Sequence, residues 1–264
     1  MTPVTLHTLK KMKQKGEKIV CITAYDALFT KLFNEVGIEV ILVGDSLGMV
    51  IQGHDSTIPV TMEDIIYHMQ CVKNGNQGAL LIADLPFMSY SSETQTLENA
   101  ARLMQAGAHG VKLEGGSWIA KSTQLLTERG IPVCAHMGLT PQSVNRLGGY
   151  RVQGRDPQQA NTIIQEALLL EEYGASMLLL ECIPAALALT ISEKLTIPVI
   201  GIGAGVDVDG QIMVMHDVLG ISPVTPKFVK NFLAISKEGI PGAIKLYVAA
   251  VKNGRFPGPE QSYN

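Results

Sequence analysis

The sequence predicts a (β/α)8 barrel, the TIM-barrel class of α/β fold, and three observations support this prediction. Short apolar runs, eight in all, alternate with segments of helical pattern along the 264 residues. The runs are continuously apolar rather than alternating, which is typical of parallel strands covered on both faces. A barrel of this kind commonly fills ~250 residues as one domain. We therefore expect one barrel domain over residues 1–264, with additional helices at its C-terminal end.

The expected strands can be placed in order from these runs. They cover residues 18–26, 39–46, 79–86, 110–116, 131–138, 176–184 and 197–205, and a weak last strand is expected at 217–221. Four helices that precede strands end in a glycine, a residue that favours the left-handed conformation after a helix. These glycines are Gly37, Gly107, Gly130 and Gly174. Thr61 and Asp64 have the spacing of a capping box and begin another helix. Terminal helices are expected over 227–236 and 243–254.

An open doubly wound sheet is the alternative fold. Its usual mark is G-x-G-x-x-G after the first strand, where the helix N-terminus meets a pyrophosphate. The segment beginning at Gly201 has Gly203 in place, but Val206 stands where the third glycine is needed. This segment also comes late in the chain. The pattern therefore favours the barrel.

Composition excludes several classes of partner. The net charge is −3 and the pI is about 6.1, so there is no general attraction to nucleic acid or anionic membranes. No run approaches the ~18 apolar residues of a membrane span, and the N-terminus lacks the apolar core of a signal peptide. The four cysteines form no C-x-x-C pair. We expect a cytoplasmic protein with free, mostly buried thiols, and no nucleic-acid or membrane partner.

Acidic residues end three consecutive predicted strands. They are Asp45, Asp84 and Glu114. The C-terminal ends of barrel strands meet at one mouth, where the active sites of such barrels lie. Like charges brought together there repel one another, and a bound cation would offset that repulsion. Because the ligands are hard oxygens, the sequence favours Mg²⁺ over zinc.

Other polar residues stand at the same strand ends and suggest a reaction type. Lys112 precedes Glu114 by two residues, so both face the same side. They could be a structural pair, or Lys112 could neutralise a carboxylate or an enolate of the substrate. Glu181 follows an apolar run, and an apolar surround raises a carboxylate pKa toward the range of a general base. A Mg²⁺-chelated 2-oxo acid could lose a proton to such a base, and its enolate would attack a carbon electrophile.

Each of these residues also has a structural explanation. Asp26 and Asp45 could each be a helix N-cap, and Glu181 could be a solvated residue at the barrel rim. His136 ends a strand as well, and it could be a hydrogen-bonded core histidine or a cap to the turn that follows. The three acids on adjacent strands carry more weight jointly than any one of them alone.

The sequence resembles the ketopantoate hydroxymethyltransferase family over residues ~20 to 220. The matching stretches, in family order, are ITAYD, LVGDSLGMVIQGHDSTIPVT, LIADLPFMSY, VKLEGG, HMGLTPQSVN, GGYRVQGR, LLLECIP, IPVIGIGAG and DGQIMVMHD. GDSLGM followed by QGHDST is the most specific of them. Ala135 stands where many members carry glycine, and the C-terminal tail matches less distinctly.

This resemblance implies a phosphoenolpyruvate/pyruvate-type barrel and a specific reaction. A one-carbon unit would pass from 5,10-methylenetetrahydrofolate to 3-methyl-2-oxobutanoate, giving 2-dehydropantoate and tetrahydrofolate on the route to pantothenate and coenzyme A. By motif, Asp45, Asp84 and Glu114 would serve Mg²⁺. The folate enters the prediction only through the family.

The resemblance also implies roles for the remaining site residues. Ser46 and Lys112 would contact the oxo acid together with the first two metal ligands, and His136 would lie beside it as a substrate-binding residue. Glu181 would accept the proton. Members of the family are cytoplasmic homo-oligomers, frequently decamers built as paired pentamers.

Two other functions fit the bare pattern of residues. One is a Mg²⁺-dependent barrel enzyme that cleaves or rearranges 2-oxo acids, as in the phosphoenolpyruvate mutase and isocitrate lyase group. The KKCGH loop that marks isocitrate lyases is missing from the sequence. The other is a non-catalytic barrel that binds a metabolite, which would have no reason to bear the repulsion of three clustered acids.

Overall fold

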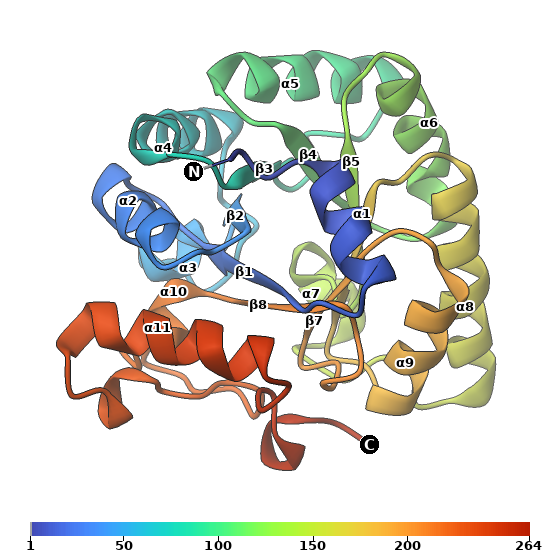
Figure 1. Ribbon diagram of the computed structural model, residues 1–264. Coiled ribbons are helices and arrows are strands. Elements are labelled where there is room, and N and C mark those ends of the chain that lie inside the picture. The colour runs from blue at the N-terminus through green and yellow to red at the C-terminus, as the bar shows by residue number, and fades with distance from the viewer. Residues whose placement is uncertain (1) are drawn as a thin grey trace.

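The computed structural model describes residues 2–264 and contains a closed barrel of parallel strands in sequential order (Figure 1). The strands are β1 (Ile19–Thr23), β2 (Val40–Val43), β3 (Leu80–Asp84), β4 (Gly110–Glu114), β5 (Val133–Gly138), β6 (Met177–Glu181), β7 (Val199–Ile202) and β8 (Gly210–Met213). β1 pairs with β2 on one side and with β8 on the other, which closes the barrel. The predicted (β/α)8 fold class is confirmed.

Helices surround the strand barrel, as Figure 1 shows. The α-helices are α1 (Leu6–Gln14), α2 (Ala27–Glu35), α3 (Leu47–Val50), α4 (Met62–Gly75), α5 (Glu93–Ala106), α6 (Ala120–Glu128), α7 (Val144–Leu147), α8 (Pro157–Glu172), α9 (Ala185–Lys194), α10 (Met215–Val218) and α11 (Gly239–Lys252). Short 3-10 turns are η1 (Ser117–Ile119), η2 (Pro141–Ser143), η3 (Leu233–Ile235) and η4 (Pro259–Gln261).

The helix ends predicted at glycines and the predicted start of α4 agree with the structure. All four glycines expected after helices have positive φ, from 80° at Gly130 to 113° at Gly107. The Thr61 hydroxyl accepts a hydrogen bond from the Asp64 amide, and the Asp64 carboxylate accepts one from the Thr61 amide. This reciprocal capping box begins α4 as expected.

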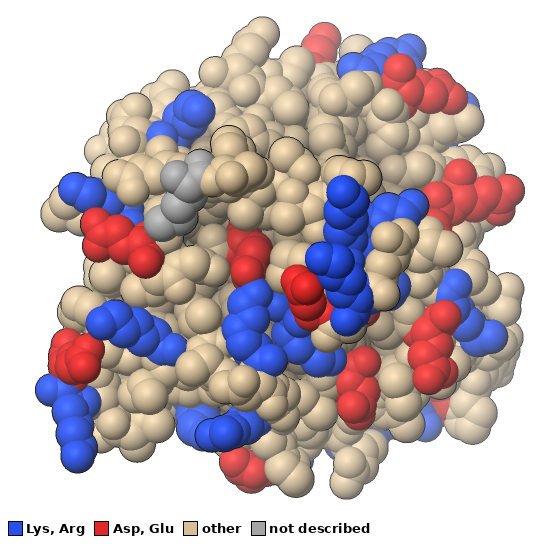
Figure 2. Space-filling view, in the orientation of Figure 1, with Lys and Arg blue, Asp and Glu red and all other residues tan. Residues whose placement is uncertain are grey.

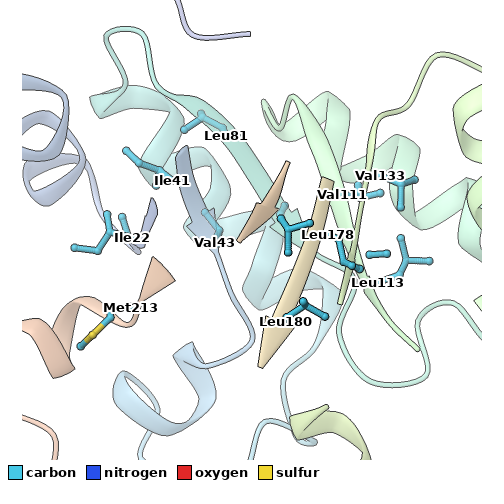
Figure 3. Packing of buried hydrophobic residues seen from close by; sticks show 14 of the residues in the cluster. Ile22, Ile41, Val43, Leu81, Val111, Leu113, Val133, Leu178, Leu180 and Met213 are labelled. Atoms are coloured by element: carbon cyan, nitrogen blue, oxygen red, sulfur yellow. The ribbon is translucent and has the colours of Figure 1, made fainter. Parts of the chain in front are cut away.

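Two apolar layers form because successive side chains of a strand point to opposite faces. One set faces the helices and includes Ile22, Ile41, Leu81 and Val111, which Figure 3 shows projecting from neighbouring strands. The alternate set fills the barrel interior with its own cluster. Members of the inner cluster are Cys21, Val40, Ile82, Leu179, Ile200 and Ile212. The period of two therefore decides which strand residues reach the interior.

Helix α1 closes the N-terminal end of the barrel. Its buried Leu9 and Met12 pack into the inner cluster with Ile19, at the start of β1. Lys13 on the same helix forms a 2.6 Å ion pair with Asp209, directly before β8. With this end plugged, the cavity of the barrel lies at the C-terminal strand ends.

The last strand lies earlier in the chain than predicted. β8 is Gly210–Met213, and the segment 217–221 that we expected as a strand begins inside α10 instead. The GQIM sequence gives a weak signal because only its last two residues are apolar. Gly210 is required by packing, since a Cβ there would lie 2.3 Å from the Ile19 carbonyl oxygen. Close approach to β1, rather than apolar character, selects this strand.

The first expected terminal helix is also wrong. Residues 227–236 form turns and the short η3 rather than a helix. Phe228 packs into the barrel interior, whereas Phe232 packs outside the strands against Tyr247 and Phe256. A helix would place these two rings on one face, so opposite packing prevents it. The second expected helix is present as α11.

The cysteines and the surface charges are arranged as the composition predicts. The cysteines of the described chain are free; Cys21, Cys134 and Cys182 are buried and Cys71 is half-buried. Figure 2 shows basic and acidic side chains mixed over the visible face. No helix within residues 2–264 has the length and apolar character needed to cross a bilayer.

The α1 plug yields a stability prediction. Leu9→Ala should lower the free energy of unfolding by about 2–5 kcal/mol, because it leaves a cavity at a fully buried position. Leu28→Ala on α2 is the matched control, since Leu28 is 80% exposed and its loss should change stability by less than ~0.5 kcal/mol. Urea unfolding followed by circular dichroism measures both. Equal effects of the two substitutions would show that α1 does not seal the barrel.

Candidate active site

The C-terminal end of the barrel holds a cavity of about 240 Å³. All the site residues predicted from the sequence line it, although they come from four strands and from the segment after β2. They are Asp45, Ser46, Asp84, Lys112, Glu114, His136 and Glu181. The site residues that lie on strands occupy inward-facing positions. Successive side chains of a strand alternate between its two faces, so the alternation that builds the inner apolar cluster also directs these groups into the cavity.

A buried lysine forms the centre of the site. The Lys112 ammonium lies 2.8 Å from Asp84 Oδ1 and 3.5 Å from Glu114 Oε1. Strand register explains the first contact, because Asp84 and Lys112 are partners across β3 and β4. Burial alone would lower the pKa of Lys112, but the neighbouring carboxylates outweigh burial and raise the pKa well above its usual value. Lys112 therefore stays positively charged.

His136 lies between two carboxylates. Its Nδ1 is 3.3 Å from Glu114 Oε1, and its Nε2 is 3.3 Å from Glu181 Oε2. Burial would lower the pKa of His136, but the contacts with Glu114 and Glu181 raise it to about 9. The imidazole thus faces the cavity and links the two acids, rather than capping the following turn.

Asp45 is oriented by backbone and side-chain contacts. Its amide donates to Asp84 Oδ2 at 2.9 Å, and its own Oδ2 accepts from the Gln142 side-chain amide at 2.8 Å. Burial and the charges of Asp84 and Glu114 raise the pKa of Asp45 well above its usual value. Gly44 permits this close packing, because a Cβ there would stand 3.5 Å from Asp84 Oδ2 and closer still to Ser46.

The N-cap explanation holds for one aspartate and not for the other. Asp26 Oδ1 accepts hydrogen bonds from the Leu28 and Phe29 amides and caps α2. Asp45 caps no helix, since α3 begins after Ser46 without a side-chain cap. Glu181 faces His136 and is 14% exposed, compared with at most 4% for Asp84, Lys112 and Glu114.

The donor set fits a hard cation whose shell is completed by water and ligand oxygens. No three His, Cys, Asp or Glu side chains in the described chain stand close enough to hold a metal alone. Glu114 Oε1 already lies near two basic groups, Lys112 and His136, and Oε2 accepts from the Gln142 amide. Each Asp84 oxygen has one such contact, Oδ1 with Lys112 and Oδ2 with the Asp45 amide, so each keeps one acceptor site. Asp45 and Asp84 are therefore the better-placed ligands, and one or two carboxylates are the usual protein share for Mg²⁺.

The charge balance also suits a cation. Five carboxyl groups line the cavity against the two basic groups Lys112 and His136, the fifth being Asp217. An excess of buried negative charge is unfavourable unless a positive partner offsets it. A divalent ion would supply such a partner.

Comparison with known proteins identifies the family. Residues 3–259 match the family described as ketopantoate hydroxymethyltransferase. The chain is also 60% identical over 265 residues to the 3-methyl-2-oxobutanoate hydroxymethyltransferase of Shewanella frigidimarina, and the alignment covers 100% of both chains. The chain belongs to the ketopantoate hydroxymethyltransferase family. It is therefore a hydroxymethyltransferase, and the resemblance carried by GDSLGM and QGHDST is confirmed.

Solved structures of other enzymes have a similar fold to this hydroxymethyltransferase. A phosphonopyruvate hydrolase in complex with oxalate and Mg²⁺ superposes with a TM-score of 0.61 at 16% identity, over 81% of each chain. A 2,3-dimethylmalate lyase of the PEP mutase/isocitrate lyase superfamily gives 0.57 at 16% identity, again over 81% of each chain. At such identity the likeness concerns the fold alone, and it agrees with the (β/α)8 barrel.

Sequence reasoning missed the neutral residues that organise the hydroxymethyltransferase site. Gln142 is buried; its backbone amide donates to Glu114, and its side chain donates to Asp45 and to the Leu85 carbonyl. Tyr90 in turn donates to the Gln142 side-chain oxygen at 2.6 Å. Gln142 lies inside the matching stretch HMGLTPQSVN, which was the one available signal.

Tyr25 organises the site at the Ser46 position. Its hydroxyl lies 2.9 Å from the Ser46 hydroxyl and is buried with the rest of the ring. Burial raises the pKa of Tyr25 well above its usual value, so the phenol stays protonated and can donate to Ser46. The ITAYD stretch contains it, but nothing in that sequence indicates the contact.

Gln142 yields a prediction for activity. Gln142→Leu keeps much of the side-chain volume but removes the donor to Asp45, and the loss of such an outer ligand contact typically costs ~10–100-fold in activity. We expect a fall of that size in kcat/KM for hydroxymethyl transfer. Gln14→Leu, an exposed position at the C-terminus of α1, is the control and should leave kcat/KM unchanged. A normal kcat/KM in the Gln142→Leu enzyme would refute its positioning role.

Proposed function

We propose that the protein transfers a one-carbon unit from 5,10-methylenetetrahydrofolate to 3-methyl-2-oxobutanoate, giving 2-dehydropantoate and tetrahydrofolate in a Mg²⁺-dependent reaction of pantothenate biosynthesis. The 60% identity to a 3-methyl-2-oxobutanoate hydroxymethyltransferase supports the oxo acid as substrate. The observation that carries the proposal is a buried lysine flanked by acids, with a separate carboxylate, Glu181, beyond His136 in the same cavity.

The cation would be held by Asp45 and Asp84, and Glu114 would act through water because its Oε1 already lies near both Lys112 and His136. When bound, Mg²⁺ supplies Lewis-acid polarisation of the carbonyl in a chelated 2-oxo acid. Gln142 keeps the Asp45 carboxylate in place while the substrate binds.

Lys112 and Ser46 orient the oxo acid. The Lys112 ammonium is a fixed positive charge in a buried site, where its attraction for developing negative charge is stronger than in water. Ser46 offers a hydroxyl held by Tyr25. Apolar side chains on the cavity wall, among them Leu42, Leu179 and Ile202, suit the branched alkyl end of the acid.

Glu181 carries the proton. It is the site carboxylate that reaches toward solvent, so it can take the proton next to the carbonyl and release it afterwards. His136 holds one Glu181 oxygen and, through its other nitrogen, is itself held by Glu114. This fixed chain aims the base at the carbon that will attack the donor.

Glu181→Gln tests the base. The variant should bind the oxo acid within about threefold of the wild type but lose exchange of the substrate's C3 proton into heavy water by at least ~100-fold, the scale of general-base catalysis. Proton NMR follows the exchange, and calorimetry follows binding. Glu193→Gln on α9, an exposed glutamate, is the control. Exchange at the wild-type rate in Glu181→Gln would remove Glu181 from this role.

Asp84→Asn tests the cation site. The amide keeps the shape and an acceptor for the Asp45 amide but loses the charge, so the Mg²⁺ concentration for half-maximal activity should rise at least ~10-fold, and oxo-acid binding should weaken with it. Asp207→Asn is the control, because Asp207 is an exposed residue of the β7–β8 loop. An unchanged Mg²⁺ titration would exclude Asp84 as a ligand.

A folate-omission assay separates this function from its rival. Enzymes that cleave or rearrange 2-oxo acids need no one-carbon donor, whereas the proposed transfer stops without it. Product formed from an oxo acid in the absence of any folate would favour the lyase or mutase reaction suggested by the shared barrel type.

A further inference from the structure

The C-terminal tail forms part of the cavity wall, although the family match ends at residue 259. This tail, residues 260–264, returns to the C-terminal end of the barrel, where its backbone carbonyls accept hydrogen bonds from other segments. The Tyr263 carbonyl accepts a hydrogen bond from the Ala185 amide at 2.9 Å, and the Ser262 carbonyl accepts one from the Lys227 ammonium. These contacts join the tail to the start of α9 and to the segment between α10 and η3.

Tyr263 lines the cavity because a glycine makes room for its ring. A Cβ on Gly203, in the turn after β7, would lie 3.1 Å from the Tyr263 ring and 3.0 Å from the Phe228 ring. Phe228 lines the cavity beside Tyr263. An aromatic wall therefore stands where the GIGAG turn leaves space.

Tyr150 lines the same cavity from the loop between α7 and α8. Its side chain is 52% exposed, and its hydroxyl lies 3.7 Å from Met49 Sδ. Partial burial raises the pKa of both tyrosines, that of Tyr263 to about 12, and the charge of Glu181 contributes at each. Both tyrosines therefore line the same cavity as Glu181 and stand within range of its charge.

Tyr150 and Tyr263 form a part of the cavity wall that we call the aromatic mouth, and two basic side chains lie near it. The Lys227 ammonium lies 5.2 Å from the centroid of the Tyr263 ring. The positive charge of Arg155 acts to lower the pKa of Tyr263. Across residues 2–264, neither Lys227 nor Arg155 has an acidic partner within 4.0 Å. The mouth therefore offers flat apolar surfaces together with unpaired positive charge.

We propose that Tyr150 and Tyr263 form the subsite for the nitrogen-containing ring system of the one-carbon donor, with Lys227 and Arg155 facing its anionic part. The inference rests on the proposed function, which makes the donor a reduced folate. Flat nitrogen heterocycles stack on aromatic side chains, and a carboxylate further along the donor would meet the two cations. A donor held here lies next to Glu181, where the substrate carbanion forms.

Kinetics with Tyr150→Ala and Tyr263→Ala test the subsite. Each variant should raise KM for 5,10-methylenetetrahydrofolate at least tenfold. Oxo-acid binding by calorimetry and exchange of the C3 proton into heavy water should stay within twofold, because neither needs the donor. Tyr150→Phe and Tyr263→Phe keep the rings and should stay within threefold of the wild-type KM. Tyr67→Ala on α4, a 63% exposed tyrosine that does not line the cavity, is the control.

The outcomes separate the subsite from a merely structural wall. A donor KM within threefold of wild type in both alanine variants overturns the proposal, and so does an equal loss of oxo-acid binding and donor affinity. If Tyr263→Ala proves too unstable to assay, the melting temperature reveals it, and Tyr150→Ala decides alone. Failure of the proposed function would appear differently, as a wild-type enzyme that exchanges no C3 proton and transfers no one-carbon unit.

Discussion

The ion pair between Lys112 and Asp84 is the interaction on which the site depends. An ammonium buried inside a barrel without a partner would carry a desolvation penalty of several kcal/mol. A penalty of that size is a large fraction of the stability of a folded protein. Asp84 and Glu114 offset this penalty, and Lys112 in turn permits two carboxylates to remain buried side by side. Each group is stable because of the others. Removing one would leave the rest as uncompensated charges, which ties the chemistry of the cavity to the integrity of the barrel interior.

Strand register holds this arrangement in place. Asp84 and Lys112 face each other as register partners on β3 and β4, as do Glu114 and His136 on β4 and β5. A slip of one residue would turn every one of these groups toward the helices, where the outer apolar cluster lies. The inner apolar residues below the site resist such a slip because they would be displaced as well. Packing at the closed end of the barrel thus fixes the geometry at the open end.

The groups that the sequence could predict are those placed by strand period and topology. Asp84, Lys112, Glu114 and Glu181 end apolar runs, so a barrel necessarily brings them to one mouth. Gln142 could not be found in this way, since its contact with Asp45 joins residues 97 positions apart through a 3-10 turn. A neutral amide acquires its function only from the acids that it happens to meet. The same limitation applied to β8, whose position depends on backbone proximity to β1 rather than on any apolar pattern.

Exposure differs across the cavity in the way that the chemistry requires. Acids that would hold a cation gain from complete burial, because a low dielectric strengthens their attraction for it and excludes competing water. A base must exchange its proton in every turnover, so complete enclosure would trap it in one protonation state. Asp84 and Glu114 are enclosed, whereas Glu181 is partly open to solvent. His136 contacts both Glu114 and Glu181, so it holds the base in place against the enclosed acids without closing it off from solvent.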